Sequence, residues 1–135
     1  MIMIVCLDDR GGMMFNHRRQ SRDRVLIEDV IRTVSNENLY ITKYSEQLFS
    51  EVGKLYSVVD DFDFISERDY AFLEDRCPSK YKDNIDKIII YRWNRAYPFD
   101  MRFDIDLEKE GFKLLDHVDF AGYSHEKITK EIFEK

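Results

Sequence analysis

The opening stretch MIMIVCLDDRGGMM (Met1–Met14) decides how the rest of the chain is interpreted. Its first part, Met1–Leu7, is apolar throughout, which is typical of a central strand covered on both faces. Two aspartates end this run, and the pair Gly11-Gly12 permits the positive φ angles of a turn. We therefore expect the chain to begin with a buried strand that leads directly into a turn.

An amphipathic helix is predicted over Arg22–Ser35, after a loop that extends from Met13 to Arg24. Apolar residues recur there at helical spacing, at Ile27, Val30, Ile31 and Val34. Either Ser21 or Asp23 can cap the start of this helix, because both side chains accept hydrogen bonds from free backbone N–H groups. The first strand is therefore followed by a helix that packs one face against the sheet.

The rest of the chain contains strands and two short helices. The strands are predicted at Leu39–Lys43, Tyr56–Val59, Asp69–Leu73, Lys87–Trp93, Met101–Leu107 and Phe112–Phe120, and the short helices at Ser45–Val52 and Pro78–Asp86. Met101–Leu107 alternates strictly between apolar and polar residues, and Ser45 is the expected cap of its helix. The pattern of the last segment fits either a helix capped by Ser124 or a strand.

This order of elements predicts an α/β fold. We expect a single-domain mixed sheet flanked by helices, with parallel strands early in the chain and antiparallel edges late. The alternative is another α+β sandwich.

The composition fits one intracellular domain spanning residues 1–135. A formal net charge of −6 makes nucleic acid an unlikely partner. The opening apolar run has seven residues, whereas a membrane helix needs about 20. Cys6 and Cys77 have no Cys or His at metal-binding spacing. We therefore expect reduced thiols, a cytoplasmic location, and neither a metal nor a cofactor.

Four segments resemble a small family of bacterial proteins, mostly clostridial, that is often labelled ribonuclease Z. They are FNHRRQSRDR (Phe15–Arg24), YRWNRAYPFD (Tyr91–Asp100), FDIDL (Phe103–Leu107) and AGYSHEKITKE (Ala121–Glu131). True ribonuclease Z enzymes carry a His-x-His-x-Asp-His metal motif. Here His17, His117 and His125 lie far apart, so the label is rejected as a statement of function.

The order of elements also resembles a shortened dihydrofolate reductase. In that family an apolar strand leads through a glycine turn into a loop over the substrate, and an acidic residue at the start of the first helix handles the pteridine ring. MIMIVCLDDRGGMM is similar to the strand and turn, and Asp23 falls near the acidic position. Later similar segments are Asn38–Phe49, Ala71–Asp75, Ser79–Ile90 and Ser124–Lys135. The resemblance implies that the last of these is a strand.

The sequence departs from those reductases where they bind the phosphates of NADPH. They have a Gly-Gly motif there, which lets backbone N–H groups approach the pyrophosphate. This chain has Glu74-Asp75-Arg76-Cys77-Pro78 instead. Two carboxylates repel a phosphate, and Pro78 has no N–H to offer. We therefore expect the nicotinamide function to be lost.

Asp23 is the candidate catalytic residue. Desolvation can raise the pKa of a buried carboxyl toward neutrality, as acid–base catalysis requires. The alternative is that Asp23 only caps the helix.

Five residues are candidates for ligand binding. Guanidinium groups bind phosphates and carboxylates, and arginines gather at Arg18, Arg19, Arg22 and Arg24, of which the first three are the candidates. The alternative is a solvated loop whose arginines pair with the protein's own acids. Trp93 and Arg95 are the other two candidates; with Tyr97 they occupy alternate positions, so they can share one face and stack on a ring. Packing and a turn at Pro98 are the alternative.

Two weaker patterns remain. Asp104 and Asp106 share one face of a predicted strand and could hold Mg²⁺ together with Asp8 or Asp9. His125 could act as a general base, but the sequence identifies no nucleophile for it.

The leading functional hypothesis is a non-redox domain of the dihydrofolate-reductase type. Such a domain binds a small anionic or aromatic ligand, or a protein partner. The first alternative is a metal-dependent phosphoesterase or nuclease. The second is a structural or interaction module that forms a homodimer. The sequence does not decide whether the protein is an enzyme.

Overall fold

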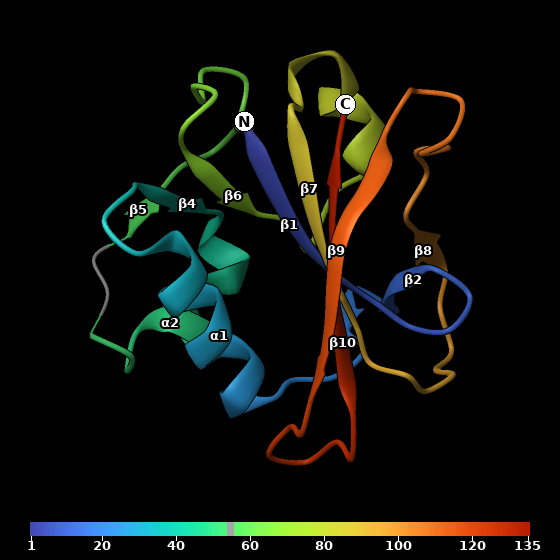
Figure 1. Ribbon diagram of the computed structural model, residues 1–135. Helices are drawn as coiled ribbons and strands as arrows, with labels where there is room; N and C mark the ends of the chain where they lie inside the picture. Colours follow the sequence, from blue (N-terminus) through green and yellow to red (C-terminus); the bar gives the residue numbers. More distant parts are fainter. Residues whose placement is uncertain (54–55) are drawn as a thin grey trace.

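The computed structural model describes residues 1–53 and 56–135, and a seven-stranded sheet forms its centre (Figure 1). The strand order is β5-β4-β6-β1-β7-β10-β9. The strands are β1 (Ile2–Leu7), β4 (Leu39–Ile41), β5 (Ser57–Val58), β6 (Tyr70–Phe72), β7 (Lys87–Arg92), β9 (Lys113–Phe120) and β10 (Ile128–Glu134). The strands from β5 to β7 in this order are parallel, and β10 and β9 are antiparallel. This confirms the predicted mixed α/β sheet and its division into early parallel and late antiparallel strands.

β1 lies in the middle of the sheet, between β6 and β7, as its apolar sequence predicts. Met3 and Val5 point into the hydrophobic core on one face, and Ile4 points into the core on the other. All three are completely buried. A strand with one face exposed to solvent would alternate apolar and polar residues. The continuous apolar run is instead what a strand covered on both faces requires.

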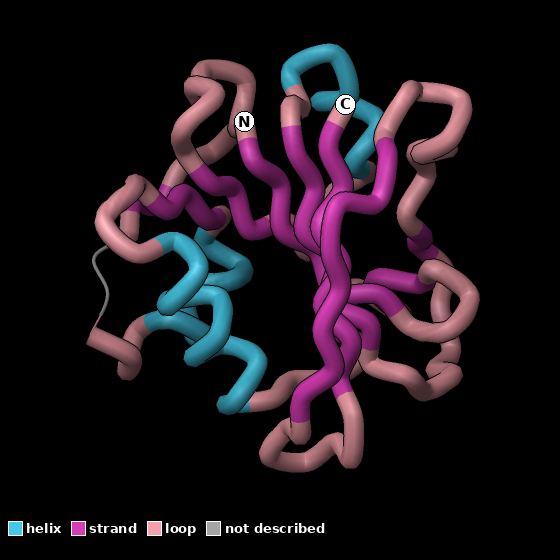
Figure 2. Tube along the Cα trace, viewed as in Figure 1, coloured by secondary structure: helices cyan, strands magenta, loops and turns pink. Residues whose placement is uncertain are grey.

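Helices cover one face of the sheet (Figure 2). They are α1 (Arg24–Val34), the short 3₁₀ turn η1 (Lys43–Ser45) and α2 (Glu46–Phe49). The predicted stripe on α1 is buried at Ile27, Val30 and Val34, where it packs with Ile4 and the aromatic residues of that core. The sequence therefore placed this helix and its buried face correctly.

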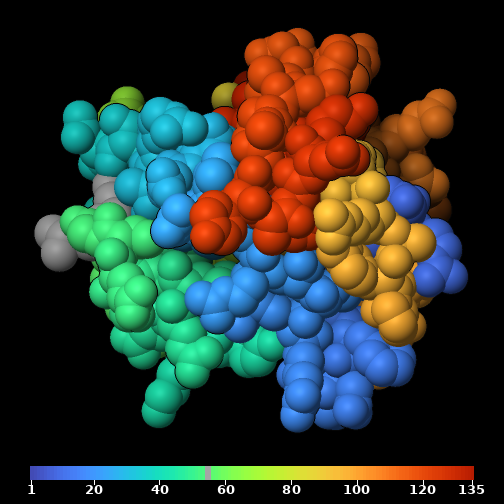
Figure 3. Space-filling view, turned by 90° about the horizontal axis from the view of Figure 1, so that it is seen from below, coloured from blue at the N-terminus to red at the C-terminus, as the bar shows by residue number. Residues whose placement is uncertain are grey.

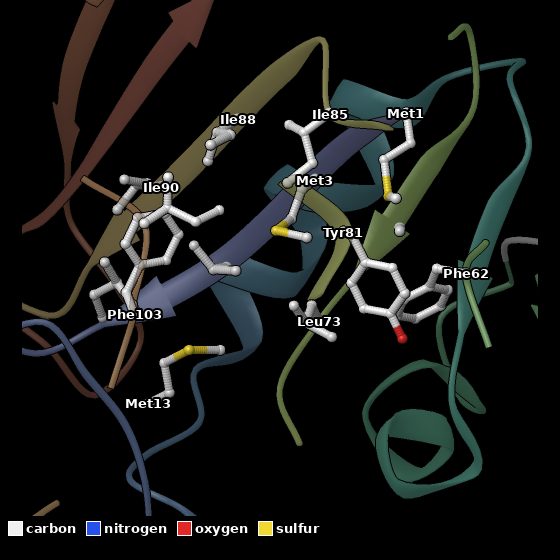
Figure 4. Close-up of a cluster of buried hydrophobic side chains, with 14 of the residues drawn as sticks. Met1, Met3, Met13, Phe62, Leu73, Tyr81, Ile85, Ile88, Ile90 and Phe103 are labelled. Atoms are coloured by element: carbon white, nitrogen blue, oxygen red, sulfur yellow. The ribbon is translucent and has the colours of Figure 1, made fainter. Parts of the chain in front are cut away.

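The opposite face is covered by short elements and loops, whose side chains form a second core (Figure 4). They are the 3₁₀ helix η2 (Pro78–Asn84) and a three-stranded sheet in which β2 (Gly12–Phe15) lies between β3 (Arg18–Arg19) and β8 (Met101–Arg102). This core holds aromatic side chains at Phe62, Tyr81, Phe103 and Phe112.

The C-terminal segment is a strand, as the likeness to reductases implies. β10 pairs antiparallel with β7 on one side and with β9 on the other. Its side chains alternate between the two faces of the sheet, as those of a strand do. Ile128 and Ile132 pack on the α1 face, whereas Phe133 packs on the other face.

The segment predicted as a loop from Met13 to Arg24 instead contains a β-hairpin. Its strands are β2 (Gly12–Phe15) and β3 (Arg18–Arg19), joined by Asn16 and His17. Both joining residues have positive φ, 52° and 61°, as a tight two-residue hairpin turn requires. The dipeptide lacks the usual glycine, so this turn is hard to recognise from the residues alone.

Two other expectations were wrong. Only β8 (Met101–Arg102) of the predicted strand Met101–Leu107 forms a ladder, although Phe103 and Ile105 are buried in alternation as expected. Ser45 does not cap α2, because its hydroxyl donates to Glu74 instead, at 2.6 Å. Among the described residues, no helix is long and apolar enough to cross a membrane.

Candidate functional site

Three loops meet around the carboxyl ends of β1 and β7. They are the turn after β1, the segment 93–100 after β7, and the loop 121–127 between β9 and β10. The start of α1 completes the group, and Figure 3 shows these segments side by side on one face. Most of the residues singled out from the sequence lie here, so the site is built from this junction.

Asp8 organises the first two loops. Its side chain is completely buried and accepts the backbone N–H groups of Gly12 at 2.7 Å, Arg10 at 2.9 Å and Tyr97 at 3.0 Å. Burial alone would raise the pKa of this carboxyl, but these N–H groups lower it below its ordinary value. Gln20 Nε2 lies 3.3 Å from the same carboxylate. Asp8 is therefore a structural anion whose acceptor positions are used within the protein.

Asp23 fixes the third loop to the start of α1. It is the N-cap of α1 and accepts the N–H groups of Val25 at 2.9 Å and Leu26 at 3.3 Å. It also accepts the N–H groups of Tyr123 and Ser124, both at 2.9 Å, from the loop between β9 and β10. The capping interpretation is therefore confirmed, and the same carboxylate joins two segments that are distant in sequence.

The electrostatics of Asp23 are opposite to what burial alone predicts. Desolvation would raise its pKa, but the N–H groups of Tyr123 and Ser124 and the ring of His125 hold the pKa well below its ordinary range. The expectation of a raised pKa is wrong for this reason. Asp23 is therefore a fixed negative charge and not a proton donor near neutral pH.

His125 is held on every side of its ring. Its Nδ1 lies 2.9 Å from Asp23 Oδ2, and Trp93 stacks on the ring at 4.7 Å between centroids. Its Nε2 faces two hydroxyl groups, Tyr97 at 3.0 Å and Ser21 at 3.1 Å. Because Asp23 is ionised, it requires a proton on Nδ1, so Nε2 of the neutral ring is the acceptor.

Trp93, Arg95 and Tyr97 reach the same loop, as their alternate spacing predicts. Trp93 is 4% exposed and stacks on His125, and Tyr97 contacts the same ring. Arg95 donates from Nη2 to the carbonyl oxygen of Ser124 at 3.2 Å. Trp93 presents its ring to a histidine, so packing accounts for its burial.

The structure does not gather the four arginines into one cluster. Arg18 is exposed on β3, and Arg24 stacks on the Tyr123 ring at 4.4 Å. Arg19 points inward, whereas Arg22 is exposed beside a groove at the start of α1. Each guanidinium group therefore has its own surroundings.

Arg19 and Glu74 fill the crevice at the carboxyl ends of β1 and β6. Arg19 Nε and Nη2 donate to the two carboxylate oxygens at 2.9 and 3.0 Å, which is the bidentate geometry. Ser45 and Tyr44 complete the network, since the Ser45 hydroxyl donates to Glu74 and the backbone N–H of Arg19 donates to the Tyr44 hydroxyl at 2.7 Å. The cavity that remains beside this pair has a volume of about 10 Å³.

Two larger hollows flank this crevice. One has a volume of about 530 Å³ and is lined by Met14, His17, Tyr44, Asp75, Asp100 and Met101. The other, of about 440 Å³, is called the α1 groove here. It lies between the start of α1, α2 and the loop after β9, and its apolar lining comes from Ile27, Leu48, Val52 and Tyr123. Both have the volume of a small-molecule site.

The aspartates proposed to hold Mg²⁺ do not converge. Asp104 accepts the N–H and hydroxyl of Ser79 at 2.8 and 2.5 Å, and Asp106 accepts the N–H of Lys109. Within residues 1–53 and 56–135, no group of three or more His, Cys, Asp or Glu side chains could hold a metal ion.

Sequence reasoning missed Ser21 as a partner of His125 and Glu74 as a partner of Arg19. These pairs are 104 and 55 residues apart in sequence, so no local spacing reveals them. One local signal exists at Gly122, where a Cβ atom would lie 2.6 Å from Asp23 Oδ2. A glycine one residue before the Tyr-Ser-His segment therefore marks a close approach to Asp23.

Comparison with known proteins supports the fold assignment alone. No family model matches the chain, and no curated protein matches it by sequence. Among solved structures, the chain is similar to dihydrofolate reductase from Enterococcus faecalis, determined in complex with NADP(H) and RAB-propyl. The TM-score is 0.67 at 9% sequence identity, over 98% of this chain and 94% of the reductase. The chain therefore has a dihydrofolate-reductase-like fold.

Proposed function

We propose that this chain is a non-redox binding domain with a dihydrofolate-reductase-like fold. Its ligand is a small molecule that combines an aromatic or apolar body with an anionic group, and it binds in the α1 groove. Two arguments support this proposal: the usual ligand crevice of the sheet is filled, and the groove beside it offers an exposed arginine.

The observation that carries the proposal is the Arg19–Glu74 pair. Open α/β sheets bind ligands outside the carboxyl ends of their strands, where successive connections leave on opposite faces. Here that position lies between β1 and β6, and Arg19 and Glu74 occupy it. The segment that follows supplies a second carboxylate, Asp75, and then Pro78 at the start of η2. This environment disfavours the pyrophosphate of a dinucleotide.

The α1 groove combines the features that an anionic aromatic ligand needs. Ile27, Leu48 and Val52 supply an apolar floor, and the exposed ring of Tyr123 stands at the rim. Arg22 also lines the groove, and in the described part of the chain its guanidinium group makes no ion pair. An exposed guanidinium beside apolar surface is suited to a carboxylate or phosphate.

Replacing Arg22 by Ala is expected to weaken binding of an aromatic anion about tenfold or more, because the charge-assisted hydrogen bonds of one guanidinium are lost. Folate and guanosine monophosphate are suitable probes, measured by calorimetric titration. A probe at about 100 times its dissociation constant adds roughly 2.7 kcal/mol to the free energy of unfolding, so thermal unfolding gives a second measurement.

The matched control is Arg68→Ala, an exposed arginine far from the groove. It should bind both probes as the wild type does. Equal losses in the two variants would show a non-specific charge effect and would contradict the groove assignment. Saturable binding of NADPH would contradict the non-redox character, and stabilisation by Mg²⁺ or Mn²⁺ alone would favour the metal-dependent alternative.

A homodimer is the second candidate, and the exposed edge strand β9 favours it. β9 ends the sheet, and Leu115 and Val118 are 57% and 51% exposed on it. An edge strand offers its outer backbone N–H and C=O groups for pairing, so β9 of a second copy can add antiparallel to this edge and cover these apolar side chains.

Val118→Lys is expected to convert such a dimer to a monomer, because a lysine on an edge strand opposes strand pairing. Light scattering over a hundredfold range of concentration measures the mass. Phe64→Ser removes an equally exposed apolar side chain outside β9 and should leave the dimer intact. A wild-type chain that is monomeric at every concentration would rule out the dimer.

A further inference from the structure

The side chains of Ser21, His125 and Asp23 have the geometry of a hydroxyl nucleophile, its base and the residue that orients the base. The Ser21 hydroxyl lies 3.1 Å from His125 Nε2, and His125 Nδ1 lies 2.9 Å from Asp23 Oδ2. Both distances fall within or at the edge of hydrogen-bond reach for an active nucleophile in a structure without substrate. We propose that these three residues form a nucleophilic triad that transfers acyl groups from small activated esters.

The protonation states of Asp23 and His125 suit this role. Although Asp23 lies almost completely buried, it accepts four backbone N–H groups, so it stays ionised. An ionised Asp23 fixes the proton of neutral His125 on Nδ1, which leaves the lone pair of Nε2 directed at the two hydroxyl groups. His125 can therefore take a proton from the Ser21 hydroxyl, and Asp23 stabilises the imidazolium that forms.

The base is also rigid. The ring of His125 is 3% exposed and is stacked on Trp93, so it cannot rotate away from Asp23. Its Nε2 has one lone pair but two hydroxyl neighbours, Ser21 and Tyr97. When Tyr97 donates to Nε2, the Ser21 hydroxyl is unactivated, and when Ser21 donates, it is activated. Tyr97 therefore competes with the nucleophile for the base.

The position of Ser21 suits attack on a small carbonyl compound. Ser21 is partly exposed and precedes the N-terminus of α1, whose backbone dipole favours negative charge. The cavity of about 10 Å³ that Ser21 lines is too small for an acyl group, so a substrate must reach the Ser21 hydroxyl from its exposed side.

The reaction has two steps, acylation of Ser21 and hydrolysis of the acyl group. Ser21 Oγ attacks the ester carbonyl carbon as its proton passes to His125 Nε2, and the bond from that carbon to the leaving oxygen then breaks. The leaving alcohol takes the proton from Nε2, which leaves an acyl group on Ser21. Water attacks this acyl group, gives its proton to Nε2, and releases the carboxylic acid with the Ser21 hydroxyl restored.

The test uses the folded wild-type chain and diisopropyl fluorophosphate, which phosphorylates activated serine hydroxyls with release of fluoride. We expect one adduct per chain by intact mass, located on Ser21 by peptide mapping. Ser21→Ala should give no adduct. His125→Gln should lower the labelling rate about a hundredfold or more, the usual contribution of a general base. p-Nitrophenyl acetate should give a burst of one nitrophenolate per wild-type chain.

Ser66→Ala is the matched control, because Ser66 is an exposed serine whose hydroxyl donates to Asp69 and touches none of the triad. It should be labelled at the wild-type rate. Absence of an adduct on the folded wild type, an adduct at another residue, or equal labelling of His125→Gln would each overturn the proposal. The wild-type mapping does not depend on whether the variants fold, and none of these outcomes depends on a ligand in the α1 groove.

Discussion

Asp23→Ala is expected to lower the free energy of unfolding by about 3–5 kcal/mol, because it removes a buried carboxylate that accepts several hydrogen bonds. The substitution leaves the N–H groups of Val25, Leu26, Tyr123 and Ser124 without their acceptor, and it leaves His125 Nδ1 with the Ser124 hydroxyl at 3.2 Å as its other neighbour. Each buried donor without an acceptor costs about 1–3 kcal/mol, although local opening toward water recovers part of this. Urea unfolding at pH 7 measures the loss.

Two further variants test this cause. Asp23→Asn keeps the size and one acceptor oxygen but loses the charge, so its loss should lie between those of the wild type and Asp23→Ala. Asp83→Ala removes an exposed carboxylate and should change stability by no more than about 0.5 kcal/mol. A loss below about 1 kcal/mol for Asp23→Ala would mean that the loop 121–127 is not anchored by this residue.

The hydrogen bonds to Asp23 make the free energy of unfolding depend on pH in the acidic range. The pKa of Asp23 is lower in the folded chain than its ordinary value of 3.8, which applies to the unfolded chain. The stabilisation is therefore complete above about pH 4 and is lost as the pH falls below that value, because protonation then favours the unfolded state. The stability difference between wild type and Asp23→Asn should shrink from pH 7 to pH 3. A constant difference would contradict the lowered pKa.

The fold was predictable where the hydrophobic pattern was long and had one solution. Met1–Leu7 is apolar on both faces and could only be a doubly covered strand, and the stripe on α1 has helical spacing. The C-terminal segment fitted either a helix or a strand, since the spacing of Ile128 and Ile132 suits both. Pairing with β7 and β9 makes it a strand, and this pairing cannot be seen in the segment itself. The hairpin at Asn16 and His17 was missed because it lacks a glycine.

The candidate site was predictable by residue type but not by partner. Asp23, Trp93 and Arg95, which were candidates from their residue types, lie together at the junction of the three loops. Their roles depend on groups far along the chain: His125 is 102 residues from Asp23, and Glu74 is 55 residues from Arg19. The direction of the pKa shift of Asp23 was also not predictable. Burial raises the pKa of a carboxyl, whereas backbone N–H groups that approach from another loop lower it.

Glu74→Ala is expected to lower the free energy of unfolding by about 2–4 kcal/mol, somewhat less than for a fully buried pair because Arg19 is partly exposed. The variant leaves the Arg19 guanidinium and the Ser45 hydroxyl without their acceptor inside the crevice. Urea unfolding measures the loss. The matched control is Glu28→Ala, which breaks the exposed pair with Arg24 and should cost less than about 1 kcal/mol.

The double variant Arg19→Met with Glu74→Leu separates two explanations of that loss. If the pair mainly fills the crevice, apolar side chains of similar size should restore most of the stability, because the desolvation cost of both charges disappears together. The coupling free energy between the two positions should then be about 0.5–3 kcal/mol. If the double variant instead loses the sum of both single losses, the two side chains act independently. The crevice would then not be closed by their pairing, and the argument against a dinucleotide at this position would lose its support.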